Sequence, residues 1–216
     1  MIDVRLNAIV DPERANGRAL GELARLVVAG GATLVQLRDK LGSTRRMIEE
    51  ARAVKAALAG SGVPLVVNDR VDVALAAGAD GVHVGQDDMG VEDARRLLGG
   101  NAIIGLSVKS VAQANAAPLD ALDYVGVGGV YATTSKDNPD PPIGVPGLRA
   151  IVAALRARRR ALPVCGIAGI DAGNAAAVIA AGANGVAVIS ALSMRADPDG
   201  AARELRRVIQ AALAER

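Results

Sequence analysis

Two aspartates of this chain lie where a metal ion could be bound. Asp69 follows the apolar run 65–67, and Asp88 follows the apolar run 81–84. In proteins Mg²⁺ takes one or two carboxylates together with water and phosphate oxygens, so two aspartates without a set of His and Cys suit Mg²⁺ better than zinc. The alternative is that they cap the helices that follow them or pair with Arg70. The pattern indicates a magnesium site and leaves the structural role open.

Basic residues follow the apolar run that precedes this pair. Arg38 and Lys40 come after the run 33–37 and, two residues apart, leave the strand end on the same side. Together with Lys136 they could hold a diphosphate, Arg38 through its planar fork and the lysines as point charges. The alternative is that they are solvated loop charges. Two carboxylates that could share a metal ion and phosphates with them favour the diphosphate.

Two later segments have the composition of a phosphate site. Gly169 follows the apolar run 163–167, and Ser190 follows the run 186–189. Backbone N–H groups after the last two strands of a barrel, at the start of a short helix, commonly hold a phosphate. These segments predict a phosphorylated ligand without saying which one.

Eight apolar runs form the framework that would position these side chains. They are continuous, as expected for parallel strands buried on both faces, and amphipathic helical patterns separate them. The runs span residues 4–10, 33–37, 65–67, 81–84, 102–106, 124–127, 163–167 and 186–189. Dividing 216 residues among eight units gives 27 residues for each, which favours a closed (β/α)8 barrel over a doubly wound sheet. We expect a single TIM-barrel domain over residues 1–216, with the polar strand ends on one face.

Smaller signals support the repeated unit. The segment 76–82 recurs almost unchanged at 180–186, each time as a helix end, a tight turn and a strand start. Asp197 and Pro198 predict the start of the last helix. His83, inside an apolar run and without an evident partner, is interpreted as structural, and Cys165 as a buried small apolar residue.

Composition excludes several classes of function. The 25 basic and 23 acidic residues leave a net charge of +2, which does not indicate a nucleic-acid partner, and two tyrosines without Phe or Trp cannot build a stacking platform for single strands. No apolar run reaches about 18 residues, so no membrane span is expected. A single cysteine fits a reducing compartment, and the first residues lack the pattern of a signal peptide. We expect a cytoplasmic protein with small phosphorylated partners; the sequence leaves its oligomeric state open.

The polar segments also form a pattern that resembles the thiamine phosphate synthase family. The stretch 36–40 matches the Gln-Leu-Arg-x-Lys segment of that family. Further matching segments follow in order at 68–74, 79–88, 104–107, 123–128, 133–136, 166–170 and 185–190. The resemblance implies a (β/α)8 transferase that condenses 4-amino-2-methyl-5-(diphosphomethyl)pyrimidine with a thiazole phosphate and releases pyrophosphate.

The resemblance also implies a role for individual residues. Catalysis would rest on Arg38, Lys40, Ser107 and Lys136. The pyrimidine diphosphate would be bound by Gln36, Leu37, Arg38, Asp39, Lys40, Asn68, Ser107 and Lys136. The thiazole phosphate would be bound by Thr133, Thr134, Ser135, Gly169, Ile189 and Ser190, and Mg²⁺ by Asp69 and Asp88.

The chain departs from the family pattern at four positions. Ser135 stands where a second Thr is frequent and keeps the hydroxyl, while Ala168 replaces a frequent Gly and could tighten the phosphate turn. Gly129 stands where Pro is usual, and Lys109 replaces a frequent His. None of these departures removes an implied ligand of the metal ion or the diphosphate.

Three other functions compete with this one. A related thiazole tautomerase would need an acid–base His in the segment 128–131, which has none. Another phosphate-binding isomerase or lyase could use the aspartate pair as acid and base, but the basic residues would then be unexplained. A catalytically silent ligand-binding barrel also fits, because fold does not fix function.

Overall fold

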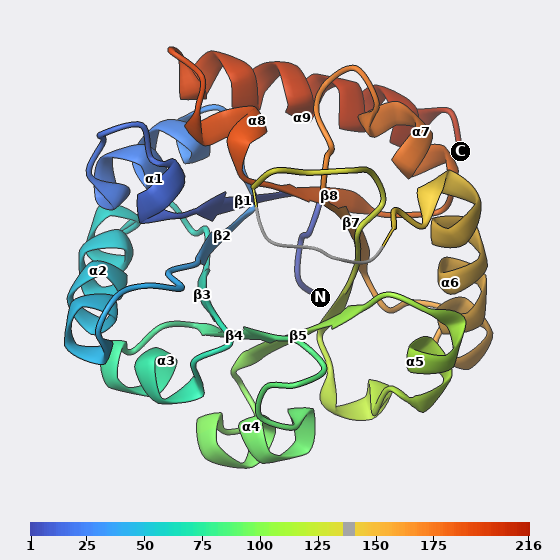
Figure 1. The fold of residues 1–216 in the computed structure, drawn as a ribbon, viewed down its shortest axis with the longest axis horizontal. Helices are drawn as coiled ribbons and strands as arrows, with labels where there is room; N and C mark the ends of the chain where they lie inside the picture. Colours follow the sequence, from blue (N-terminus) through green and yellow to red (C-terminus); the bar gives the residue numbers. More distant parts are fainter. Residues whose placement is uncertain (136–140) are drawn as a thin grey trace.

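Eight parallel strands close into a barrel, in the order of the sequence, in the computed structural model of the chain (Figure 1). The structure describes residues 1–135 and 141–216. The strands are β1 (Leu6–Val10), β2 (Leu34–Leu37), β3 (Leu65–Asn68), β4 (Gly81–Val84), β5 (Ile103–Val108), β6 (Tyr124–Val127), β7 (Val164–Ile167) and β8 (Gly185–Val188). β1 pairs with both β2 and β8, which closes the ring and confirms the predicted (β/α)8 fold.

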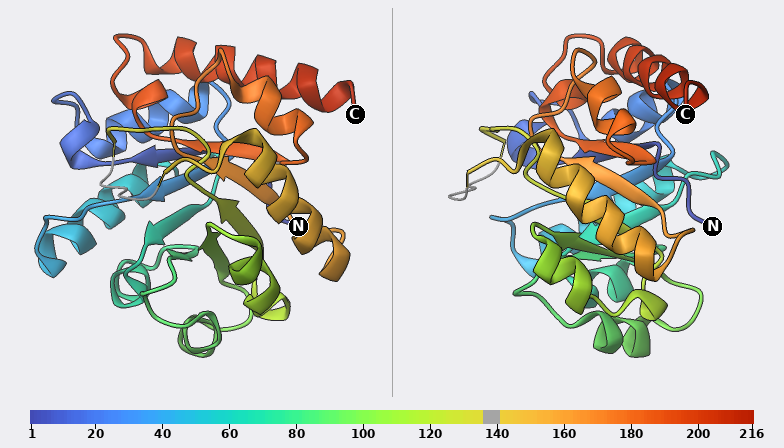
Figure 2. Two further views of the ribbon diagram at one scale, coloured as in Figure 1. Left: turned by 45° about the vertical axis from the view of Figure 1, so that its right-hand side comes forward. Right: turned by 90° about the vertical axis from the view of Figure 1, so that its right-hand side faces the viewer.

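Helices surround the barrel, and the side views place them outside the strands all round (Figure 2). The α-helices are α1 (Leu20–Ala29), α2 (Thr44–Ala57), α3 (Val71–Ala77), α4 (Val91–Leu98), α5 (Val111–Ala116), α6 (Gly144–Arg158), α7 (Ala175–Ala180), α8 (Ser190–Ser193) and α9 (Pro198–Ala214). Two 3-10 turns, η1 (Pro12–Arg14) and η2 (Leu119–Ala121), complete the connections. In the part of the chain that the structure describes, no helix is long and apolar enough to cross a membrane.

Most strands face an apolar layer on both sides, which explains the continuous apolar runs. In β2, Val35 and Leu37 belong to the layer between strands and helices, whereas Leu34 belongs to a smaller cluster inside the barrel. Tyr124 and Cys165 lie in that interior cluster and are fully buried. Because both faces of the sheet are covered, alternation of apolar and polar residues is lost.

The residue just before each even-numbered strand is hydrogen-bonded to the start of the preceding strand. The side chain of the residue just before β4, Asp80, accepts the backbone N–H of Leu65 at the start of β3, at 2.8 Å, and Asn184 before β8 accepts that of Val164 at 3.0 Å. Thr33 and Asp123 make the corresponding bonds to Leu6 and Ile104. The four residues return a backbone bond to the same four partners. The internal repeat seen in the sequence is therefore part of a wider structural repeat.

Several expected boundaries shift by one or two residues. The run 102–106 becomes the longer strand β5, and the run 186–189 becomes β8, because Ile189 already leaves the extended conformation to begin α8. The predicted start of the last helix is confirmed: the Asp197 side chain accepts the N–H of Gly200 at 3.0 Å, and Pro198 is the first helical residue.

The single cysteine provides a test of the packed interior. Cys165 has no exposed surface, and burial raises the pKa of its thiol to about 12. Below that pKa the thiol stays protonated, so at neutral pH it is both inaccessible and unreactive. We expect no reaction of the native protein with a chromogenic disulfide reagent, and reaction of one thiol per chain after unfolding in guanidinium. Rapid labelling of the native protein would contradict this packing.

Candidate functional site

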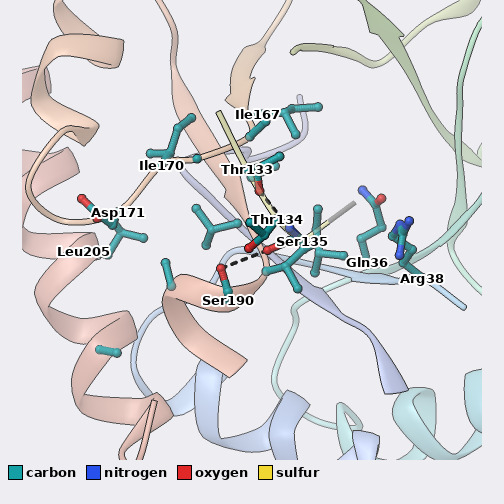
Figure 3. Close-up of a pocket in the computed structure, with 18 of the residues that line it drawn as sticks. Gln36, Arg38, Thr133, Thr134, Ser135, Ile167, Ile170, Asp171, Ser190 and Leu205 are labelled. Atoms are coloured by element: carbon teal, nitrogen blue, oxygen red, sulfur yellow. Dashed lines mark hydrogen bonds between the residues drawn. The ribbon is translucent and has the colours of Figure 1, made fainter. Parts of the chain in front are cut away.

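A cavity of about 810 Å³ opens at the carboxyl ends of the strands. Ten of the predicted site residues line it: Gln36, Arg38, Asn68, Ser107, Thr133, Thr134, Ser135, Gly169, Ile189 and Ser190. They come from six different strand ends, and Figure 3 shows Gln36 and Arg38 on one side of the cavity and Thr133, Ser135 and Ser190 facing them from the other. The convergence expected from the barrel is therefore present for these ten.

Two further predicted residues have side chains with structural roles, and one cannot be placed. Leu37 is buried in the layer between strands and helices, so its side chain does not face the cavity. Asp39 folds the following turn, where its Oδ1 accepts the N–H groups of Leu41 and Gly42 at 2.9 and 2.8 Å. Lys136 lies outside the described residues.

A buried ion pair holds Arg38 in the cavity wall. The guanidinium donates to Oδ2 of Asp11 at 2.5 Å, and the Asp11 side chain is 1% exposed. Oδ1 of Asp11 accepts the backbone N–H of Glu13 at 2.9 Å, which fixes the carboxylate at the start of η1. Arg38 is thus held by a carboxylate that is itself held by the backbone, which limits the orientations of its fork.

Next along the chain in η1, Arg14 connects the same loop to a second part of the site. Its guanidinium donates to the carbonyl oxygen of Thr134 at 2.7 Å. The loop after β1 therefore contacts both the Arg38 side and the Thr134 side of the cavity. Sequence reasoning missed this loop, although Asp11 directly follows an apolar run as the other candidates do.

The two aspartates are brought together at this end of the barrel. Asp69 pairs with the ammonium of Lys40, and the carboxyl of Asp88, whose Oδ2 accepts the N–H of Gly85 at 2.7 Å, lies close enough to act on Asp69. Burial and the Asp88 carboxyl raise the pKa of Asp69 while Lys40 lowers it, and the net shift is upward. The alternative pairing with Arg70 is not formed, because Arg70 binds Asp72 instead.

This donor set fits a magnesium ion better than a softer metal. Within residues 1–135 and 141–216 no group of three or more His, Cys, Asp or Glu side chains could enclose a metal. Two adjacent carboxylates, one with a raised pKa, form an oxygen-only site that would need water and substrate oxygens to complete it, as Mg²⁺ prefers. Asp69 has a φ of 64°, a left-handed conformation that only a few residue types accept without large strain.

Hydroxyls and glycines converge on the other side of the cavity. Ser135 donates to the hydroxyl oxygen of Ser190 at 3.1 Å, and its own N–H donates to Oγ1 of Thr133 at 3.1 Å (Figure 3). At Gly169 (φ 65°), a Cβ would lie 2.4 Å from the carbonyl oxygen of Ala132, so only glycine fits. Ala168 has a φ of 80°, so the departure from glycine there leaves an alanine in a conformation that costs about 1 kcal/mol.

His83 makes more contacts near the cavity than the sequence suggested. It is buried inside the barrel yet lines the cavity floor with Gln36, Asn68 and Ser107. Its imidazole hydrogen-bonds to Ser107 at 2.8 Å and to the hydroxyl of Tyr124 at 2.9 Å, so the expectation of a His without an evident partner was wrong. A single histidine among apolar residues gave no signal for these contacts, because they join strands β4, β5 and β6.

The arginines at the end of α6 have a structural role. Arg156 donates to Oδ1 of Asn184 at 2.8 Å, Arg158 to the carbonyl oxygen of Ala114 at 2.7 Å, and Arg159 to that of Leu122 at 2.8 Å. These arginines bind oxygen atoms of the neighbouring segments.

Comparison with known proteins gives a consistent result. The sequence profile of the family described as "Thiamine monophosphate synthase" matches residues 6–192. A thiamine-phosphate synthase of Agrobacterium fabrum is 54% identical over 100% of this chain and 98% of its own, and one of Chloroflexus aurantiacus is 47% identical over 97% and 94%. A solved thiamine phosphate pyrophosphorylase of Pyrococcus furiosus has 36% identity and a TM-score of 0.84, covering 98% of each chain.

Removing one partner of the Asp11–Arg38 pair should destabilise the protein strongly. Asp11→Ala would leave the largely buried Arg38 without its counter-charge, so we expect the free energy of unfolding to fall by about 3 kcal/mol. The matched control is Asp72→Ala, which breaks the exposed pair with Arg70 and should cost less than about 1 kcal/mol. Urea denaturation of both variants measures the difference. Equal losses would mean that Asp11 does not hold a buried charge.

Proposed function

The chain belongs to the thiamine monophosphate synthase family, and we propose that its cavity joins a pyrimidine methyl diphosphate to a thiazole phosphate with release of pyrophosphate. The activity is that of a transferase in thiamine biosynthesis. The observation that carries the assignment of the site is that Arg38 and Ser190 line one cavity. A guanidinium suited to a diphosphate and a hydroxyl suited to a monophosphate are thereby within reach of two substrates bound side by side.

The diphosphate would lie on the side of Arg38. Its guanidinium keeps donors beyond the one given to Asp11, because the fork has five N–H groups. Lys40 is half exposed and paired with Asp69, so its ammonium can share its charge with a phosphate. Gln36, Asn68 and Ser107 on the floor offer hydrogen bonds to the pyrimidine. From the resemblance, Lys136 joins this group.

The thiazole phosphate would lie on the side of the hydroxyls. Thr133, Ser135 and Ser190 present side-chain oxygens there, and Gly169 allows a close approach to the backbone. Thr134 and Ile189 also line this part of the cavity. Leu37 and Asp39 would contribute through the backbone and the turn that they form rather than through their side chains.

Asp69 and Asp88 are the residues that would hold Mg²⁺. When bound, the ion would supply positive charge to the oxygens of the leaving diphosphate. Asp69 and Asp88 offer only oxygens, and the ammonium of Lys40 beside them keeps part of their charge balanced until a cation and a phosphate arrive.

The reaction needs no protein nucleophile. The bond between the methylene carbon and the diphosphate oxygen breaks, its electron pair leaves with pyrophosphate, and the thiazole nitrogen then bonds to the carbon. Arg38 and Lys40 stabilise the charge that gathers on the leaving group, and they are held in place before it forms. Holding two substrates in one cavity supplies the positioning.

The rival functions find less support. A tautomerase would need an acid–base His near the loop after β6, whereas the one His of the chain lies in β4 inside the barrel. An isomerase or lyase that uses Asp69 and Asp88 as acid and base leaves Arg38 and Lys40 unexplained. We propose that residues 1–216 act as one domain on small phosphorylated substrates.

The direct test is to mix purified protein with both substrates and Mg²⁺ and to look for thiamine phosphate by mass spectrometry. We expect product that depends on both substrates and on the metal. Absence of product under conditions in which a known relative turns over would overturn the proposal.

The metal assignment is tested by removing each carboxylate. We expect Asp69→Ala and Asp88→Ala to lower Mg²⁺-dependent turnover about 100-fold, because the charge that offsets the leaving group is lost. Asp72→Ala, a neighbouring exposed carboxylate, is the matched control and should keep its activity. Circular dichroism checks the fold of all three. Unchanged rates and unchanged Mg²⁺ dependence in both variants would contradict the assignment.

The two subsites are tested by a crossed pair of variants. We expect Arg38→Ala to lower kcat and to raise the KM for the pyrimidine diphosphate about 100-fold, with little effect on the KM for the thiazole phosphate, since charge-assisted bonds to the diphosphate are lost. Ser190→Ala should raise the KM for the thiazole phosphate by up to about tenfold with little effect on the diphosphate. Steady-state kinetics with each substrate varied in turn measures both. The opposite pattern would mean that the subsites are interchanged.

A further inference from the structure

A chain of three side chains runs from the barrel interior to the cavity floor. The hydroxyl of Tyr124 lies 2.9 Å from Nδ1 of His83, and Nε2 of His83 lies 2.8 Å from Oγ of Ser107. Tyr124 has no exposed surface and His83 is buried, whereas Ser107 lines the cavity. These hydrogen bonds therefore connect a fully buried hydroxyl to one that a ligand can contact.

The strands leave space for this chain. In the barrel register Gly105 pairs with His83 on one side and with Tyr124 on the other. A Cβ at position 105 would lie 2.5 Å from Nδ1 of His83 and 2.3 Å from Cζ of Tyr124. The two rings meet only because the strand between them has no side chain at this level.

The backbone of Ser107 is fixed as well. The side-chain amide of Gln86, in the loop after β4, donates to the carbonyl oxygen of Ser107 at 2.7 Å. This bond acts on the backbone, whereas the side-chain oxygen is held by Nε2 of His83.

The buried tyrosine sets the direction of the hydrogen bonds. Within residues 1–135 and 141–216, the hydroxyl of Tyr124 has one hydrogen-bond partner, Nδ1 of His83. A buried O–H group must donate to an acceptor, so Nδ1 accepts and the proton of the neutral imidazole lies on Nε2. Nε2 then donates to Oγ of Ser107, and the serine hydrogen is directed away from the histidine.

We propose that Tyr124 and His83 are positioning residues that hold the Ser107 hydroxyl as a hydrogen-bond donor to an acceptor atom of the pyrimidine diphosphate. The assignment of that ligand rests on the proposed function, whereas the direction of the two hydrogen bonds does not. A serine hydroxyl in solution donates and accepts equally well. Here one of its accepting positions is used inside the protein, which orients the remaining donor before the substrate arrives.

The histidine tautomer can be measured without any substrate. The chain contains one histidine, so ¹⁵N-histidine labelling gives the imidazole spectrum of His83 alone. At about pH 7.5 we expect the proton on Nε2, with Nδ1 as the unprotonated nitrogen. In Tyr124→Phe, which keeps the ring and removes the donor, we expect the Nδ1 signal to shift and the second tautomer to appear. A proton on Nδ1 in the unaltered protein would overturn the proposed direction.

The functional part is tested by a double-mutant cycle. We expect Tyr124→Phe to lower kcat/KM about tenfold, mainly through the KM for the pyrimidine diphosphate, with the KM for the thiazole phosphate unchanged. Ser107→Ala should have at least as large an effect. In the double variant, loss of the tyrosine hydroxyl should cost nothing further, because it acts through Ser107. Effects that multiply in the double variant would show that Tyr124 does not act through Ser107.

A matched control separates positioning from packing. Cys165→Ala removes a buried group from the interior cluster that contains Tyr124 and leaves the hydrogen bonds of Tyr124, His83 and Ser107 in place. It should lower the thermal midpoint and leave both KM values unchanged. If Cys165→Ala raised the KM for the pyrimidine diphosphate as Tyr124→Phe does, general loosening of the barrel would explain the effect and the proposal would fail. The tautomer could be as expected while neither the unaltered protein nor any variant makes thiamine phosphate. In that case the proposed function fails and the hydrogen-bond direction stands.

Discussion

Closure of eight parallel strands in sequence order is the constraint on which the site depends. Because every strand runs in the same direction, residues as far apart as Gln36 and Ser190 leave the sheet at one end. None of the lining segments could form a cavity alone. Charges are then fixed within this ring, since Arg38 is held by Asp11 and Lys40 by Asp69 before any ligand is bound. The barrel supplies proximity, and the ion pairs supply orientation.

The fold and most of the candidate site could be predicted from the sequence for a physical reason. Buried parallel strands give continuous apolar runs, and the polar residue that follows each run must lie at the same end of the barrel. Arg38, Asn68 and Ser107 carry this local signal. His83 and Tyr124 do not, because their contacts cross three strands and depend on the absence of a side chain at Gly105. Such contacts follow from register, which apolar patterns alone do not give.

Two non-glycine residues with left-handed backbone lie at strand ends in this region. Asp69 follows β3 and Ala168 follows β7, and both have a positive φ. Strain of this kind persists where the surroundings determine the conformation, and it often accompanies binding sites. Asp69 directly follows Asn68, whose side chain lines the cavity. The left-handed backbone at Asp69 places its carboxylate beside Asp88. At Ala168 it begins the turn in which Gly169 packs against Ala132.

The reciprocal bonds at the starts of β2, β4, β6 and β8 each join two consecutive strands, and the described residues contain four of them. The barrel can thus be divided into four strand–helix–strand modules, each tied within itself at the end opposite the cavity. New termini placed between modules, for instance in the connection from β2 to β3, would leave all four ties uncut. Circular permutants opened there should keep the barrel closed better than those opened inside a module, because each of the four modules stays whole.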